Sequence, residues 1–227
     1  MKVWLSGFIL IMVLAYLVFF HFYTTPEKVI SLTAGDFEHI RFSSKNPSQY
    51  RYQENKLLIE VENSASFLMQ AFDEVKHVNK VAFEWRSQGA PAIIDAAHEA
   101  RRDGDDAVFK LGLLLSSDSS PDDIFLPSWM RRVKELLHFD SEQMMFLVAG
   151  AKHPAGQHWQ GPYNSRMTMI SMISVTDQQG WNKAVYEFEQ PVEVVAMWLM
   201  ADGDDTRSTF TTEIKNIVIG ESDGVTE

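Results

Sequence analysis

The chain has 227 residues, 45% of them hydrophobic and 22% charged, and its formal net charge is −11. This acidic balance argues against nucleic acid as a partner, because a general affinity for nucleic acid requires clustered Lys and Arg. The absence of cysteine excludes disulfides, thiolate metal sites and thiol catalysis. Six Trp, six Tyr and fifteen Phe can cover a sizeable core, so most of the chain is expected to fold.

The first element in chain order is an apolar run at residues 3–23, VWLSGFILIMVLAYLVFFHFY. As a helix it would be roughly 31 Å long, enough to cross a hydrocarbon core of about 30 Å. It ends in aromatic residues, which suit a membrane interface, whereas a signal peptide ends in small residues at its cleavage site. We therefore expect residues 1–23 to be a transmembrane signal anchor that contacts the lipid bilayer through residues 3–23. A cleaved signal peptide is the alternative.

The charges that flank this run predict its orientation. Lys2 and the α-amino group precede it, while Glu27 and Lys28 cancel each other after it. Because positive charge is retained on the cytoplasmic side, the N-terminus is expected in the cytoplasm and the rest of the chain on the far side. The predicted location is the bacterial inner membrane, single-pass, with a periplasmic C-terminal domain.

A tether at residues 24–28 leads to a predicted β domain at residues 29–221, and residues 222–227 form an acidic tail. Short apolar runs separated by turn residues predict strands, and several alternate with period two. Many short strands and few helical patterns favour an all-β fold, an antiparallel β-sandwich of the jelly-roll type. The expected strands are residues 29–34, 37–42, 56–62, 66–72, 80–87, 107–117, 143–150, 165–174, 192–200 and 210–220.

One or two short helices interrupt the strands. Within residues 121–140, Trp129, Val133, Leu136 and Leu137 recur at helical spacing, and Ser128 is the expected N-cap. We expect this helix to pack its apolar stripe over an open end of the sandwich, with membrane or partner docking by its basic face as the alternative. Residues 90–104 are expected to form a shorter helix or an irregular loop.

The tetrad Asp-Gly-Asp-Asp occurs twice, once before an expected strand and once after another. If those two strands are antiparallel neighbours, the two tetrads share one edge of the sheet and their carboxylates crowd together. Crowded carboxylates repel, shift their pKa values or bind a cation, and calcium suits such oxygen ligands best. Solvated turns without a metal are the alternative, because Asp-Gly is a common turn signal. The candidate metal ligands are Asp103, Asp105, Asp106, Asp202, Asp204 and Asp205.

A second candidate site is the segment 151–166, AKHPAGQHWQGPYNSR. Flat aromatic faces beside amide and imidazole groups provide the apolar platform and directional hydrogen bonds that a sugar ring requires. A structural loop whose Trp packs inward is the alternative. The spacing of His153 and His158 does not match an established zinc site. The expected ligand-binding residues are His158, Trp159, Tyr163 and Asn164.

The order of motifs is distinctive. A strand ending in FEWRS is followed by a Gly-Asp-Asp turn and then by a Leu-Pro-x-Trp helix start, formed by Leu126, Pro127 and Trp129. The segment HPAGQ comes next. An Asp-x-Asp-x-Thr turn, formed by Asp202, Asp204 and Thr206, then precedes a last strand, EIKNIVIG. This series resembles a bacterial family of uncharacterised envelope proteins, domain of unknown function 3047.

The resemblance covers about residues 29–221 and implies a build similar to galactose-binding-like jelly rolls. It also implies that calcium, the one cofactor suggested by the sequence, acts as a structural clip. Two features depart from the family pattern: Lys110 stands where the family has an Arg, and the region after Trp181 is shorter. A resemblance of fold does not by itself establish a reaction.

Catalytic signatures are absent from the sequence. It contains no G-x-S-x-G elbow, H-E-x-x-H motif, P-loop or dinucleotide fingerprint. A glycosidase would need two inward-facing carboxylates about 5–10 Å apart. Five glutamates are available, but the sequence cannot pair them: Glu60, Glu62, Glu84, Glu187 and Glu189.

We therefore expect non-catalytic binding of a carbohydrate or another envelope component, with His158, Trp159 and Tyr163 as the platform. Two alternatives remain open: a glycan-processing enzyme that uses a carboxylate pair, and a scaffold subunit of a membrane complex that binds an envelope protein.

Overall fold

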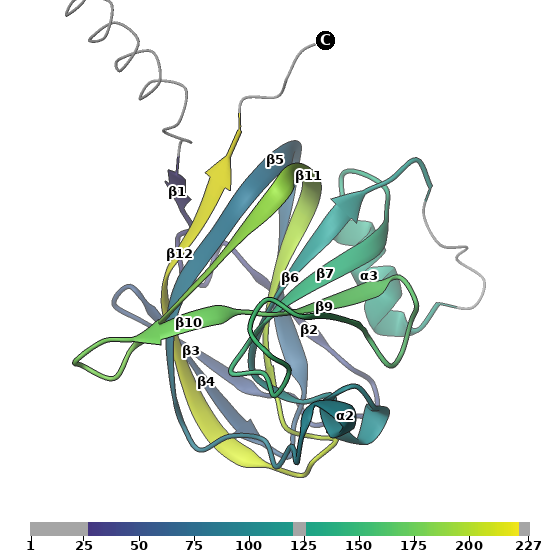
Figure 1. Ribbon diagram of the computed structural model, residues 1–227. Helices are drawn as coiled ribbons and strands as arrows, with labels where there is room; N and C mark the ends of the chain where they lie inside the picture. Colours follow the sequence, from purple (N-terminus) through teal and green to yellow (C-terminus); the bar gives the residue numbers. More distant parts are fainter. Residues whose placement is uncertain (1–26, 120–125, 223–227) are drawn as a thin grey trace, which may run out of the picture.

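The computed structural model describes residues 27–119 and 126–222, and within them twelve strands join into one curved sheet (Figure 1). The strands are β1 (Glu27–Val29), β2 (Glu38–Arg41), β3 (Gln49–Gln53), β4 (Lys56–Glu62), β5 (Ser66–Gln88), β6 (Ala107–Ser116), β7 (Ser141–Ala149), β8 (His158–Gln160), β9 (Met167–Ser171), β10 (Ile173–Thr176), β11 (Asn182–Asp202) and β12 (Thr209–Glu221). The helices are α2 (Ala96–Glu99), the 3-10 helix η1 (Arg102–Gly104) and α3 (Ser128–Leu136). The prediction of a mostly β domain with few helices is confirmed. The predicted anchor lies outside the described residues, and none of the helices described is long and apolar enough to cross a membrane.

The sheet folds into two layers that share β5 and β11. The first part of β5 pairs with β2 and with the last part of β11, and this layer, the β6 layer, continues through β6, β7 and β9 to β8. The second part of β5 pairs with β12, and this layer, the β12 layer, continues through β4 to β3 and carries β10 on β11. Register shifts between Glu187 and Val192 and between Val194 and Ala196 interrupt the β5–β11 ladder. Such irregularities bend strands, so both long strands can cross from one layer to the other.

The main hydrophobic core lies between the layers. In β4, Leu57, Ile59 and Val61 are buried while their neighbours are more exposed, as the period-two pattern predicts. Phe83 and Phe109 meet these residues from the two layers and pack edge to face, with ring centroids 5.0 Å apart. The predicted two-layer arrangement is thus consistent with the structure.

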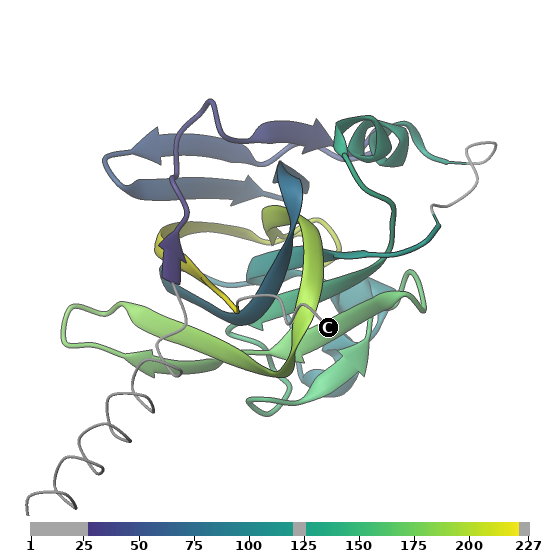
Figure 2. The same cartoon turned by 90° about the horizontal axis from the view of Figure 1, so that it is seen from above.

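A second, smaller core lies on the outer face of the β6 layer, under α3. Trp129 and Val133 of α3 pack there with Phe67, Phe146 and Trp198 of the sheet. Figure 2 shows α3 next to β2, where Arg132 pairs with Glu38 at 2.8 Å. The predicted apolar stripe of the helix is therefore confirmed, but it covers a face of the sheet and not an open end of the sandwich.

Several predicted details of the elements are wrong. Residues 66–72 and 80–87 belong to one continuous strand, β5, because the polar residues between them stay extended across the bend. Strands β3 and β8 were not predicted, since their sequences QYRYQ and HWQ lack apolar runs. The N-cap of α3 is Pro127, and Ser128 is already helical, with its hydroxyl 2.7 Å from that of Ser43.

The sheet is also not purely antiparallel. Strands β7 and β9 are parallel neighbours, because the long connection at residues 150–166 returns the chain to the same end of the sheet and places β8 beyond β9. The finer assignment to a galactose-binding-like jelly roll stays a prediction.

Gly112 explains how two large rings fit side by side in the second core. In the sheet register it stands between Phe146 of β7 and Trp198 of β11. A Cβ atom on Gly112 would lie 2.9 Å from the Phe146 ring and 3.2 Å from the Trp198 ring. A side chain at this position would therefore push the rings apart.

We expect Gly112→Ala to lower the free energy of unfolding by about 1–3 kcal/mol, the usual effect of overpacking. Urea unfolding measures the change. The control is Gly35→Ala, because nothing lies within 4 Å of a Cβ atom added at Gly35. Equal stability of the two variants would contradict the packing described here.

Candidate functional site

The two Asp-Gly-Asp-Asp tetrads meet at one end of the β6 layer. Strands β6 and β11 are antiparallel neighbours, and Asp202 at the end of β11 is in register with Ala107 at the start of β6. The Asp202 carboxylate accepts a hydrogen bond from the Ala107 N–H at 3.0 Å. The predicted meeting of the tetrads is therefore confirmed. We call the five aspartates gathered here the acid end: Asp105, Asp106, Asp202, Asp204 and Asp205.

The sixth predicted metal ligand, Asp103, does not belong to the acid end. Its exposed carboxylate pairs with Arg101 at 3.2 Å. The next residue, Gly104, is held against the backbone of His98, where an added Cβ atom would lie 2.4 Å from the carbonyl oxygen. The short turn η1 thus separates Asp103 from the rest of its tetrad.

Lys110 lies at the centre of the acid end and is buried with Asp105 and Asp202. Its Nζ donates to the backbone oxygen of Asp105 at 2.8 Å, to the Asp105 carboxylate at 3.2 Å and to the Asp202 carboxylate at 3.1 Å. Burial alone would lower the pKa of Lys110, but the carboxylates of Asp105, Asp202 and Asp106 outweigh it and raise this pKa. Burial raises the pKa of Asp105 and of Asp202, and Lys110 partly opposes both shifts. Lys110 therefore stays charged and holds the two tetrads together.

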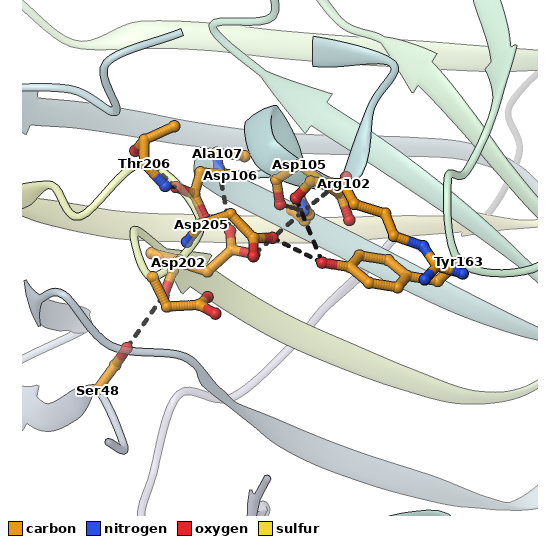
Figure 3. A network of polar contacts seen from close by, with 12 residues as sticks. Ser48, Arg102, Asp105, Asp106, Ala107, Tyr163, Asp202, Asp205 and Thr206 are labelled. Atoms are coloured by element: carbon orange, nitrogen blue, oxygen red, sulfur yellow. Dashed lines mark hydrogen bonds and ion pairs between the residues drawn. The ribbon is translucent and has the colours of Figure 1, made fainter. Parts of the chain in front are cut away.

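The other carboxylates fix the turn after β11 and reach the surface. Asp106 accepts hydrogen bonds from the backbone N–H and the hydroxyl of Thr206, both at 2.6 Å. Asp205 accepts a hydrogen bond from the Tyr163 hydroxyl at 2.8 Å, and Figure 3 shows the Tyr163 ring directed toward it. Lys45 forms an ion pair with Asp204 and lies 3.6 Å from Asp205. Among the described residues, two lysines thus contact the five carboxyl groups of the acid end, so acidic groups outnumber their cationic partners.

Calcium binding at the acid end stays a prediction. Oxygen atoms of Asp106, Asp204 and Asp205 lie within 4.8 Å of one another, but the Thr206 donors, Lys45 and the Tyr163 hydroxyl already engage all three carboxylates. Calcium that acts as a structural clip should raise the melting temperature above that of a chelated sample. An unchanged melting temperature would contradict the clip.

A pocket of about 800 Å³ extends from the acid end to the space under α3. Strands β6, β7 and β11 form its floor with Leu114, Phe146, Trp198 and Met200, and α3 covers it with Trp129, Met130, Val133 and Leu137. At the acid end the pocket is lined by Lys45, Asp105, Lys110, Asp202, Asp204 and Asp205. The loop before β9 lines it with Tyr163, Asn164 and Arg166. The pocket is therefore apolar along most of its walls, with polar groups at the acid end and again at the start of β7, where Ser141, Glu142 and Gln143 line it.

Trp198 in the pocket floor carries a polar atom without a protein partner. The side chain is 4% exposed and its ring stacks on Phe67, with centroids 3.8 Å apart. Among the described residues nothing accepts a hydrogen bond from its Nε1–H. A buried donor without an acceptor is unfavourable.

The four predicted ligand-binding residues do not form one platform. Tyr163 and Asn164 line the pocket, but His158 and Trp159 do not. Successive side chains of a strand point to opposite faces, so these two neighbours in β8 are separated. Trp159 packs against the second core and stacks on His153 with centroids 3.9 Å apart, while the exposed His158 lies 3.0 Å from the Tyr186 hydroxyl. The alternative that the Trp packs inward thus describes Trp159.

The five glutamates considered for a glycosidase pair also lie elsewhere. Glu60 pairs with Arg51 at 2.7 Å and Glu84 with Lys215 at 3.1 Å, both on the β12 layer. None of the five lines the pocket that the described residues form. The carboxylates that line the pocket are instead aspartates of the two tetrads and Glu142, which pairs with Arg166 at 3.2 Å.

Comparison with known proteins places the chain in a family. Residues 36–218 match the family model described as protein of unknown function, DUF3047. The chain belongs to this family. The predicted resemblance is thereby confirmed. A search of curated proteins finds no match.

Among solved structures, the chain is similar to a low-affinity xylan-binding module, CBM86, of the gut symbiont Roseburia intestinalis. The identity is 10%, the TM-score is 0.38, and the match covers 87% of this chain and 96% of the module. A likeness this weak establishes neither a common fold nor a common ligand.

This DUF3047 protein also contains a buried acid–imidazole pair that sequence reasoning missed. Glu99 is 3% exposed and accepts hydrogen bonds from the backbone N–H groups of Lys152 and His153, each at 2.9 Å. Its carboxylate also lies 2.6 Å from Nδ1 of His153. Glu99 therefore anchors the loop that leads to Tyr163 and Asn164. In the sequence Glu99 belongs to HEARR, residues 98–102, which lacks the second His of an H-E-x-x-H motif.

We expect Glu99→Gln to lower the free energy of unfolding by about 1.5–3 kcal/mol, because hydrogen bonds to a buried charged group are lost. Thermal or urea unfolding measures the effect. Glu135→Gln on the exposed side of α3 is the control and should change stability little, since its partner Arg132 is also exposed. A Glu99→Gln protein as stable as this control would show that Glu99 does not anchor the loop.

Proposed function

We propose that this protein binds, without transforming it, a carbohydrate or another hydroxyl-rich component of the cell envelope in the pocket under α3. The observation that carries the proposal is the excess of carboxylates at one end of a large, aromatic-walled pocket. Ionised carboxylates only accept hydrogen bonds, so a ligand at the acid end has to donate them. Sugar hydroxyl groups donate to carboxylates and also accept, for example from Arg166, which lines the pocket.

The chemistry of the acid end favours binding over turnover. A raised pKa keeps Lys110 protonated, so it serves neither as a base nor as a nucleophile at neutral pH. Asp106 is already engaged by two Thr206 donors. Asp205 with Tyr163 is the polar pair best placed to meet a ligand, since both line the pocket and both are partly exposed.

The proposal is tested by titrating the full chain with a panel of envelope glycans and measuring both affinity and product formation. Asp205→Asn is expected to weaken binding about tenfold or more, because a hydrogen bond to a charged group is lost. Asp103→Asn makes the same change at an exposed carboxylate outside the pocket and should leave the affinity unchanged. Equal affinities of the two variants, or hydrolysis of a bound glycan, would contradict the proposal.

We further propose that residues 3–23 anchor the protein in the inner membrane and that the β domain is periplasmic. The support is the length of the apolar run, its aromatic end and the position of Lys2. A C-terminal alkaline phosphatase fusion is expected to be active and to sediment with membranes. An inactive fusion would contradict the orientation, and an active fusion released into the soluble fraction would contradict the anchor.

A further inference from the structure

The pocket has far more apolar wall than a free sugar requires. Sugar-binding surfaces need one flat apolar face and several hydrogen-bonding groups. Here three consecutive pocket-facing positions of β6 run from Lys110 through Gly112 to Leu114. At the rise of a strand these span roughly 13 Å, so polar and apolar ends are well separated along one wall.

The neighbouring strands repeat this gradient. On β11 the order is Asp202, Met200 and Trp198, and in the register of the sheet Met200 is beside Lys110 and Trp198 beside Gly112. On β7, Met144 is in register with Leu114. The floor therefore changes from carboxylate and ammonium groups to aromatic rings and then to Leu114 and Met144, and the polar start of β7 forms the far mouth of the pocket.

Helix α3 covers the pocket with apolar side chains. Met130 and Val133 of α3 and Leu137, which follows the helix, face the pocket, and Val133 is buried in the second core. Pockets of about 300–1,000 Å³ bury most of the surface of a small organic ligand, and this one has about 800 Å³. A head of hydroxyl groups and a hydrocarbon chain fit the two ends at the same time.

We infer that the ligand is an amphiphile, with a hydroxyl-bearing head at the acid end and an alkyl or acyl chain between the sheet and α3. This inference rests on the proposed function and narrows it from envelope components in general to glycosylated lipids. The head donates a hydrogen bond to Asp205, and the chain covers Phe146, Met144 and Met130. Trp198 lies between the two.

Calorimetric titration of the full chain with methyl, butyl, hexyl and octyl β-D-glucopyranosides, each below its micelle concentration, tests the inference. Each added methylene group buried in the pocket should tighten binding about three- to fourfold. In a second arm, 1-octanol is compared with octyl glucoside. The head contributes if octyl glucoside binds at least about tenfold more tightly than the alcohol.

Matched variants of α3 locate the chain. Met130→Gln puts an amide into the apolar wall and should reduce the gain per methylene group, while the binding of methyl glucoside stays unchanged. Arg131→Gln introduces the same residue at the next, exposed position and should leave the whole series unchanged.

The outcomes separate the inference from the proposed function. Affinity that rises with chain length and falls in Met130→Gln but not in Arg131→Gln supports the inference. Equal affinity for methyl and octyl glucoside overturns it and leaves the proposed function standing. Equal affinity for octanol and octyl glucoside supports the chain but overturns the hydroxyl head of the proposed function. No binding in either arm overturns both.

Discussion

Replacement of Lys110 by Met is expected to lower the free energy of unfolding by about 3–5 kcal/mol. The side chains have similar lengths, so the main loss is the positive charge between Asp105 and Asp202. Both carboxyl groups are buried, and without Lys110 each must either keep a charge without its ion-pair partner or take up a proton, and both are unfavourable at neutral pH. Urea unfolding at neutral pH measures the effect. Lys45→Met, which removes a partly exposed lysine from Asp204, should have a smaller effect.

The loss caused by Lys110→Met should also depend on pH. Burial raises the pKa of Asp105 and Asp202 in the folded protein, and Lys110 opposes this rise. A carboxyl group whose pKa is raised by folding stabilises the fold below its unfolded pKa, and this contribution is lost as pH rises through the folded value. Without Lys110 these pKa values rise further, so protonation restores stability to the variant at a higher pH. The difference in free energy of unfolding between Lys110→Met and the unmodified protein should therefore shrink as pH falls from about 7 towards about 5. A difference that is constant or grows on acidification would contradict a charge-based role for Lys110.

Replacement of Trp198 by Ala is expected to lower the free energy of unfolding by about 3–5 kcal/mol, because it leaves a cavity beneath α3. The ring stacks on Phe67 and lies edge to face with Phe146 and Trp129, with centroids 5.0 and 6.3 Å away. The second core is built around these contacts, so its loss should also loosen α3.

Trp198→Phe separates packing from hydrogen bonding. Phe keeps an aromatic ring against Phe67 and removes an N–H group that has no acceptor among the described residues. Its stability loss should be less than half that of Trp198→Ala, because the N–H group that is removed makes no hydrogen bond within the described residues. Urea unfolding of both variants measures the difference. A Phe variant that is as unstable as the Ala variant would contradict this role of Trp198.

Sequence reasoning located the acid end because its logic depended only on strand order. An Asp-rich turn that leaves one strand and another that enters an antiparallel neighbour must share an edge, and β11 and β6 are such neighbours. The helix of residues 128–136 was also predictable, since its apolar stripe has a clear period. Strands β5 and β11 were predicted in part, because a bend between two layers does not change the apolar pattern on either side.

The remaining features of the site depend on long-range packing that sequence patterns do not record. In the sequence analysis Lys110 is a departure from the family pattern and not a predicted site residue. A lysine inside the apolar run AVFKLGLLL is nevertheless itself a signal of a buried ion pair. Trp159 was expected to face a ligand, but the side to which it points depends on the register of β8 against β9. The pocket under α3 could not be predicted, since helix and floor come from segments far apart in the chain.

The central claim, a ligand pocket between α3 and the β6 layer, is tested most directly by thiol protection. The chain has no cysteine, so Met130→Cys places a single thiol in the pocket wall and Arg131→Cys places one on the exposed side of the same helix. Each variant is labelled with a small alkylating reagent, with and without a sonicated extract of bacterial envelopes. We expect the extract to slow labelling of Met130→Cys and to leave that of Arg131→Cys unchanged. Equal labelling rates of Met130→Cys with and without the extract would contradict the claim.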